Sequence, residues 1–219
     1  MKFFCFVVCC LSGAASLLAQ ENWQQALQRM PLNVEIPLSR ENCLPRLLAA
    51  FQSNQIVKAF VISPSVCDDF YLINRNGPKL TLKADNVFAA IVALTNLTSA
   101  RFTCSPPLLL LHLERDALQP ALIIKHPATA ARLAQQSHFP HAFWSDIPWE
   151  RLQPELRKAL KLNIQPWAKS VDAWHIPRHN LTAWNLSDWD LVSALSLAGK
   201  TSILVQRNGL RLGARETIR

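Results

Sequence analysis

The chain has 219 residues, a formal net charge of +8 and a pI near 9.5. Its basic residues are scattered, and no basic stripe is interleaved with aromatic residues, so we expect no nucleic-acid partner. The chain has five glycines and none forms a phosphate-cradling loop, which argues against a nucleotide-binding enzyme.

The N-terminus has the pattern of a secretory signal peptide. Lys2 is the only charged residue before Glu21, residues 3–11 are apolar, and small residues follow them. Cleavage after Ala15 or Ala19 fits the small-residue rule, and the signal is assigned to residues 1–19. No later apolar run is long enough to span a membrane. We therefore expect an exported protein that is periplasmic or associated with the outer envelope.

The cysteines divide between the signal and the mature chain. Cys9 and Cys10 leave a lipoprotein signal open as the alternative, although the residues before them lack the small residue that such signals carry. Beyond the signal, an odd number of cysteines remains, which permits at most one internal disulfide and one free thiol. Cys43 and Cys67 are the expected disulfide pair, which leaves Cys104 as the free thiol.

The first half of the chain is assigned to residues 22–118. A strand end or turn is expected at residues 35–38, and an amphipathic helix follows it. The apolar residues of this helix recur at helical spacing: Leu44, Leu47, Leu48 and Phe51. Apolar runs come next at residues 56–62 and 70–73, and then a turn at residues 74–78.

A strand–helix–hairpin unit closes the first half. Leucines alternate with polar residues over 80–83, which predicts a short half-buried strand. Asn86 follows at a helix N-cap position, where its side-chain oxygen accepts amide hydrogens of the first turn. The expected helix has apolar residues at helical spacing: Val87, Ile91 and Leu94, with Phe88 and Val92 beside them. Strands at 101–104 and 108–113 then form a hairpin.

The second half is assigned to residues 121–219. Gln119 and Pro120 join the halves, and residues 122–124 are an expected extra strand. Residues 146–149 repeat the turn pattern of residues 35–38. Another amphipathic helix follows, with Leu152, Leu156 and Leu160 on its apolar face, and short apolar patches lie around Ile164, Trp167 and Trp174.

The second half also ends in a strand–helix–hairpin unit. Ser187 stands at the N-cap position and residues 199–200 at the helix end. The apolar residues of the helix are Trp189, Val192, Leu195 and Ala198. Strands at 202–205 and 210–212 flank Asn208-Gly209, a strong hairpin signal because both residues tolerate positive φ.

These two units are an internal repeat. Residues 80–113 align with residues 181–214 without a gap, at an offset of 181 − 80 = 101 residues. A duplicated unit of this size needs a neighbour to bury its apolar face, which is typical of binding and assembly scaffolds. The sequence predicts an α+β fold of tandem small β-α-β-β modules, with helices packed on short mixed sheets.

Particular residues of the repeat carry a resemblance to a known family. They are Leu80-Thr81-Leu82, Asn86-Val87, Ala93-Leu94 and residues 97–102 in the first copy, and Leu181, Leu186, Trp189, Ala194-Leu195, Ala198-Gly199-Lys200 and Ile203 in the second. The pattern resembles the short N-terminal domain shared by secretins and TonB-dependent transducing receptors. The family's glycine at the helix end occurs here only in the second copy. The resemblance implies an envelope protein that docks other proteins through small α+β modules.

Two histidine pairs have spacings found in zinc ligands, at residues 138–141 and 175–179. Pro140 and Pro177 break the helices that would present each pair on one face. No cysteine pair accompanies them. We therefore expect surface loop histidines, no metal and no cofactor.

A thiol nucleophile with a histidine base is an open alternative at Cys104 and His112. The two residues fall on neighbouring strands of one expected hairpin, so contact between them is conceivable. No nucleophile signature surrounds Cys104, and no oxyanion hole is evident. The alternative is a hydrolase of unrecognised type.

Tryptophan is concentrated in the second half, which holds six of the seven. Core packing explains most of them, including Trp189 in the predicted helix. Trp167, Trp174 and Trp184 are candidate binding residues, because an exposed indole can serve as a platform for a sugar ring or a partner side chain.

The sequence thus favours a non-enzymatic exported envelope protein. Its modules would dock other envelope proteins within a secretion or transport assembly. The alternative is a secreted glycan-binding module that uses the exposed tryptophans. The sequence leaves the oligomeric state open.

Overall fold

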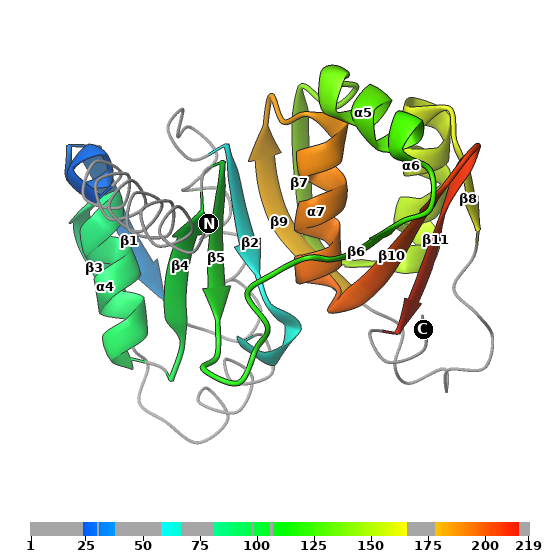
Figure 1. The fold of residues 1–219 in the computed structure, drawn as a ribbon. Coiled ribbons are helices and arrows are strands. Elements are labelled where there is room, and N and C mark those ends of the chain that lie inside the picture. The colour runs from blue at the N-terminus through cyan, green and yellow to red at the C-terminus, as the bar shows by residue number, and fades with distance from the viewer. Residues whose placement is uncertain are drawn as a thin grey trace, which may run out of the picture.

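The computed structural model describes residues 24–29, 31–37, 58–66, 81–97, 99–105, 107–165 and 178–214. Helices pack on mixed sheets throughout these residues, which confirms the predicted α+β class (Figure 1). The predicted signal peptide, the expected Cys43–Cys67 pair and the helix expected at Leu44 to Phe51 lie outside the described residues.

The first half begins with a short helix at residues 24–28, in which Leu27 is fully buried. The elements that follow are β1 (Pro31–Pro37), β2 (Ala59–Ile62), β3 (Thr81–Asn86), α4 (Val87–Leu97), β4 (Arg101–Ser105) and β5 (Leu108–His112). A single helical turn at residues 64–66 comes directly after β2.

The second half contains more described elements. They are β6 (Ala121–Ile124), α5 (Pro127–Gln135), β7 (His141–Pro148), α6 (Trp149–Leu160), β8 (Asn163–Gln165), β9 (Arg178–Trp184), α7 (Asp188–Ala198), β10 (Thr201–Gln206) and β11 (Gly209–Ala214). The extra strand expected at residues 122–124 is present as β6. The amphipathic helix expected after residues 146–149 is α6, and Leu152, Leu156 and Leu160 are buried on its apolar face.

The two copies of the repeat keep their offset in the structure. Helix α4 spans residues 87–97 and α7 spans 188–198, so both ends are 101 residues apart. In the hairpins, Arg101 pairs with His112 and Ser202 with Gly213, which is the same register. The other pairings recur as well: antiparallel β1·β3 corresponds to β7·β9, and parallel β2·β5 to β8·β11.

The predicted helix caps are confirmed in both copies. The Ala89 amide donates to Asn86 Oδ1 at 2.8 Å, and the Asp190 amide donates to Ser187 Oγ at 3.0 Å. Helix α7 ends with Gly199 as its C-cap residue, as the sequence predicts. Gly199 has a φ of −105°, and the residue in the left-handed region at this helix end is Lys200, with a φ of 50°.

Strands from the two halves form one sheet. Its order is β4-β5-β2-β9-β7, with the first three strands from the first half and the last two from the second. Strand β2 lies at the junction, parallel to β5 on one edge and antiparallel to β9 on the other. The second half completes a four-stranded sheet of order β6-β10-β11-β8, and β1 pairs with β3.

Strand β2 has no exposed side, because each face of the shared sheet carries a different core. Ala59 and Val61 belong to the apolar cluster that includes α7. Phe60 and Ile62, with the opposite side-chain direction, are also buried. They share their face with Phe102 of β4, whose ring meets Phe88 of α4 edge-on at 6.2 Å. Alternate side chains of this one apolar strand therefore pack into the core of one half and then of the other.

Helix α7 is buried because it lies between two sheets (Figure 1). It contacts β9 and β2 of the five-stranded sheet and β10 and β6 of the four-stranded sheet, and α5 packs beside it. Every residue from Leu191 to Ala198 is buried. Two serines in this stretch satisfy their hydroxyls on carbonyls, Ser193 on Trp189 O at 2.9 Å and Ser196 on Thr201 O at 2.6 Å. A helix with no charged residue from Leu191 to Ala198 suits this enclosed position.

The interpretation of the second hairpin turn was partly wrong. Gly209 already pairs with Gln206, so the two turn residues are Arg207 and Asn208. None of Arg207, Asn208 and Gly209 is among the described residues with positive φ. Gly209 is instead required for space, because a Cβ built there would lie 2.2 Å from the Asn163 carbonyl oxygen of β8.

Gly209→Ala is expected to lower the free energy of unfolding by about 1–3 kcal/mol, because the added Cβ would force the β8 backbone away from β11. Urea denaturation of both proteins measures this difference. Asn208→Ala, in the same turn at an exposed side chain, is the matched control and should change stability by less than about 0.5 kcal/mol. Equal stability of Gly209→Ala and the parent would contradict the close approach of β8.

Candidate binding surface

An exposed aromatic surface lies where β7 and β9 meet the start of β2. We define the aromatic surface as Lys58, His141, Phe143 and Trp184. Trp184 is 42 % exposed and Phe143 is 38 % exposed, which makes them two of the four large apolar side chains that stand out among the described residues.

Strand pairing sets the geometry of the aromatic surface. Trp184 lies opposite His141, and Phe143 lies opposite Thr182, one step along the same face. The Trp184 amide donates to the Lys58 carbonyl at 2.7 Å, which continues the ladder to the residue before β2. The rings of His141 and Trp184 are tilted, with centroids 5.2 Å apart. Strands β7 and β9 and the residue before β2 therefore hold an imidazole, an indole and a cation in one row.

The alternation of β7 explains why this surface faces outward. Ala142 and Trp144 are buried in the core that includes α7, so His141 and Phe143 must lie on the opposite face. Trp184 was predicted from the sequence as a candidate binding residue, but its neighbours His141, Phe143 and Lys58 were not. The alternation of His-Ala-Phe-Trp carried that signal, but the pairing of β7 with β9 was needed to bring the residues together.

The other candidate tryptophans do not extend this surface. Trp167 and Trp174 lie outside the described residues. Trp144 and Trp149 are 5 % and 1 % exposed, and Trp189 is half-buried against the core. Among the tryptophans that the structure describes, Trp184 alone is exposed.

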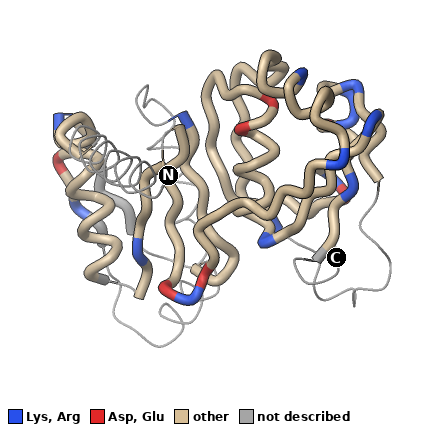
Figure 2. Tube along the Cα trace, in the orientation of Figure 1, with Lys and Arg blue, Asp and Glu red and all other residues tan. Residues whose placement is uncertain are grey.

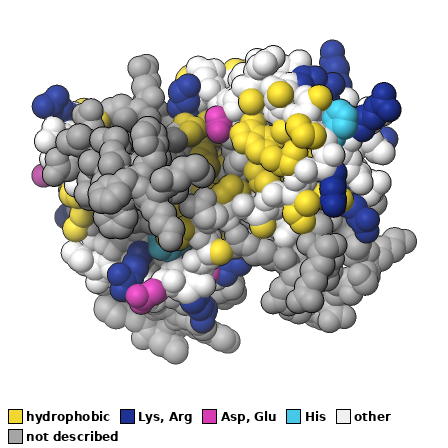
Figure 3. Space-filling view, in the orientation of Figure 1, with side chains coloured by type: hydrophobic (Ala, Val, Ile, Leu, Met, Phe, Trp, Pro, Cys, Tyr) yellow, Lys and Arg dark blue, Asp and Glu magenta, His cyan; other side chains and the backbone are white. Residues whose placement is uncertain are grey.

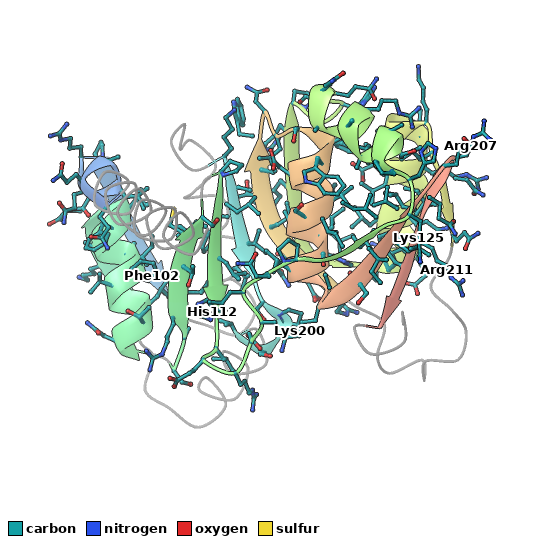
Figure 4. All side chains as sticks on the ribbon, in the orientation of Figure 1. Phe102, His112, Lys125, Lys200, Arg207 and Arg211 are labelled. Carbon is teal, nitrogen blue, oxygen red and sulfur yellow. The ribbon has the colours of Figure 1, made fainter. Side chains whose placement is uncertain are left out.

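The Cys104 and His112 arrangement does not form. Cys104 pairs with Leu109 and Arg101 pairs with His112, so the thiol and the imidazole point to opposite faces of the hairpin. His112 instead contacts Thr103 Oγ1 at 3.0 Å and the Leu113 carbonyl at 2.8 Å. Burial raises the pKa of the Cys104 thiol to about 12, which suppresses the reactive thiolate. Figure 4 labels His112 on its strand.

The histidine pairs do not converge on a metal site. His138 binds Asp188, with 2.6 Å between Nδ1 and Oδ2, whereas His141 packs against Trp184. His175 lies outside the described residues. Within the part of the chain that the structure describes, no group of three histidine, cysteine, aspartate or glutamate side chains is placed to hold a metal ion.

His179 is a buried core residue, contrary to the surface loop expected for it. It is 0 % exposed, and its ring lies 5.9 Å from the Trp149 ring. Neither ring nitrogen has a hydrogen-bond partner among the described residues. Burial lowers the pKa of His179 to about 4, although the Ile147 backbone acts in the opposite direction. A Cβ at Gly199 would lie 2.6 Å from His179 Nε2, so the glycine leaves room for this ring.

A buried carboxylate ties the two halves together, and we call this cluster the Asp116 clasp: Ser63, Ser65, Asp116 and Lys200. Ser63 and Ser65 follow β2 and donate to Asp116 at 2.7 and 3.0 Å. The Leu113 amide also donates to Asp116, at 2.9 Å. Lys200, from the end of α7, lies 2.6 Å from Asp116 Oδ1 and also contacts the Ser65 hydroxyl. Figure 4 labels Lys200 between the two halves.

The Asp116 clasp is better suited to stabilising the contact between the halves than to catalysis. Burial on its own would raise the pKa of Asp116, but bonds from Lys200, Leu113 and Ser63 outweigh it and lower the pKa to about 2. The Lys200 ammonium donates to Asp116 and Ser65. An ammonium has no hydrogen-bond acceptor, so Lys200 cannot take a proton from a serine hydroxyl. This cluster was not predicted from the sequence, because its members come from three separate segments and form no motif.

Comparisons with known proteins gave no relative. No family model, no curated protein and no solved structure matches the chain. Among the described helices, none combines the length and apolar character needed to cross a membrane.

Asp116→Asn is expected to lower the free energy of unfolding at neutral pH by about 1–3 kcal/mol, because it breaks the pair with Lys200. The carboxylate's contribution is present above its ordinary pKa of 3.8 and is lost as the pH falls through about 2. The parent should therefore lose about 1 kcal/mol more than Asp116→Asn between about pH 5 and about pH 2, with allowance for screening at the exposed lysine.

Urea denaturation at each pH measures both effects. Glu114→Gln is the matched control, because Glu114 is a neighbouring carboxylate whose side chain is 79 % exposed and pairs with exposed Arg101. The control should follow the parent at every pH. Identical pH profiles of the parent and Asp116→Asn would contradict the lowered pKa.

Proposed function

We propose that this chain is a non-enzymatic, exported envelope protein that docks other proteins through its tandem α+β modules. The resemblance to the short N-terminal domain of secretins and TonB-dependent transducing receptors supports an envelope location and a docking role. The predicted signal peptide supports export. The periplasm or the outer envelope is the proposed compartment.

The observation that carries the proposal is the aromatic surface. Trp184 and Phe143 are large apolar side chains that the fold leaves exposed, although the neighbouring Trp144 is buried. Tryptophan and other aromatic residues are enriched among the residues that dominate binding energy at protein interfaces. Lys58 and His141 add polar groups beside them, as in the rim of an interface.

A glycan is the second candidate ligand, and the same residues favour it. An exposed indole offers a flat apolar face, and Lys58 and His141 supply hydrogen-bonding groups beside it. A sugar ring stacked on Trp184 would change the tryptophan fluorescence. A fluorescence titration that reports on Trp184 therefore tests glycan binding directly.

Trp184→Ala is expected to weaken the binding of an envelope protein partner by about 30-fold or more, because loss of a central aromatic residue typically costs at least about 2 kcal/mol. The immobilised chain is first used to retain proteins from a solubilised envelope extract. Each retained protein is then purified, and its Kd is measured against the parent and against Trp184→Ala and Phe143→Ala.

Leu118→Ala is the matched control, because Leu118 is 43 % exposed and lies in the segment between β5 and β6, outside the aromatic surface. It should leave the Kd unchanged, and all variants should keep the thermal stability of the parent. Failure to retain any partner, or a Kd that neither aromatic substitution alters, would refute docking through this surface. Fluorescence quenching by a cell-wall polysaccharide that Trp184→Ala abolishes would establish the glycan alternative instead.

A further inference from the structure

Cations scattered in the sequence gather at one end of the second half. We define the basic rim as Lys125, Lys161, Arg207 and Arg211, all with exposed side chains. Figure 2 shows basic residues collected at the end of the second half remote from the first half. In the space-filling view, dark blue side chains stand out on the same side (Figure 3), and Lys125, Arg207 and Arg211 are labelled there in Figure 4.

The four-stranded sheet brings the basic rim together. Strand β6 runs parallel to β10, so Lys125 at its end reaches the β10–β11 turn that holds Arg207, and the Lys125 amide donates to Val205 O at 3.0 Å. Strand β8 runs parallel to β11 from the same end, and the Asn163 amide donates to the Asn208 carbonyl at 3.0 Å. Lys161 lies two residues before the first residue of β8.

The outer face of the sheet continues this charge. Arg211 of β11 lies opposite Leu204 on one side and Gln165 on the other. The four strands of the sheet contain no aspartate or glutamate. Each member of the basic rim is without an ion-pair partner among the described residues. No direct ion pair therefore neutralises the charge of the rim within the described chain.

An apolar side chain accompanies these cations. Ile124, directly before Lys125, is 47 % exposed, the largest exposed fraction among the large apolar side chains of the described residues. The pairing of Ile124 with Val205 places it at the rim end of β6, on the face of the sheet opposite to Arg211. Lysine and arginine combined with exposed apolar side chains are also the groups by which amphipathic helices bind a lipid interface.

We propose that the basic rim binds the surface of an anionic lipid bilayer, with Ile124 entering the headgroup region. Lysine and arginine near an anionic membrane surface each strengthen binding by roughly fivefold, and an aliphatic side chain adds apolar burial. A nucleic acid fits the rim less well, because none of its members is an aromatic residue on which a base could stack. Membrane contact at this end leaves the aromatic surface, on the strands that adjoin the first half, open for a partner.

The test measures binding of the purified full chain to liposomes by co-sedimentation. The liposomes are phosphatidylcholine alone, or phosphatidylcholine with about one third phosphatidylglycerol. The chain should bind only the anionic liposomes, and binding should weaken as salt is raised. The double substitution Lys125→Gln/Arg207→Gln should lower the partition coefficient by about 30-fold, and Ile124→Ser by several-fold.

Arg115→Gln is the matched control, because Arg115 is an exposed cation in the segment between β5 and β6 and outside the rim. It should bind like the parent. The proposal is overturned if the folded chain ignores anionic liposomes, if Lys125→Gln/Arg207→Gln and Arg115→Gln lose the same affinity, or if duplex DNA at equal phosphate concentration displaces the liposomes through the same rim. None of these outcomes involves a protein partner, so the result stands apart from the docking proposal.

Discussion

The rest of the structure depends on one four-residue strand, β2. It is paired at both edges and covered on both faces, so its residues belong to the cores of both halves at once. A strand in this position must be apolar at every residue, and Ala-Phe-Val-Ile meets that requirement. Its counterpart in the second half, Asn-Ile-Gln of β8, buries only the central residue and stands at a sheet edge. The difference between these two strands decides where the halves join.

Much of the fold could be predicted because the deciding interactions are local. Asn86 and Ser187 cap helices a few residues away, and the apolar spacing of α4, α6 and α7 follows from helix geometry. The pairing of β2 with β9 could not be predicted, since it joins residues 59–62 to residues 180–183 across most of the chain. Gly209 shows the same limit. Its turn signal was local, but the need for glycine comes from the approach of Asn163.

Three residues of the candidate surfaces lie at positions where the two copies of the repeat differ. At the offset of 101 residues, Trp184 corresponds to Lys83, Arg207 to Pro106 and Arg211 to Leu110. Residues that build the fold, such as the helix caps, are instead shared by both copies. The second half thus keeps the scaffold and changes its outer residues. One exposed residue, Trp184, was found from composition, but its neighbours required the strand pairing.

The most direct test of this account is whether the halves unfold as one unit. Ile91 of α4 is 1 % exposed in the first half, whereas six of the seven tryptophans lie in the second. If β2 couples the two cores, Ile91→Ala should lower the thermal midpoints seen by far-UV circular dichroism and by tryptophan fluorescence equally, by about 5–15 °C. A tryptophan midpoint that stays at the parent value while the circular dichroism splits into two transitions would contradict the shared sheet.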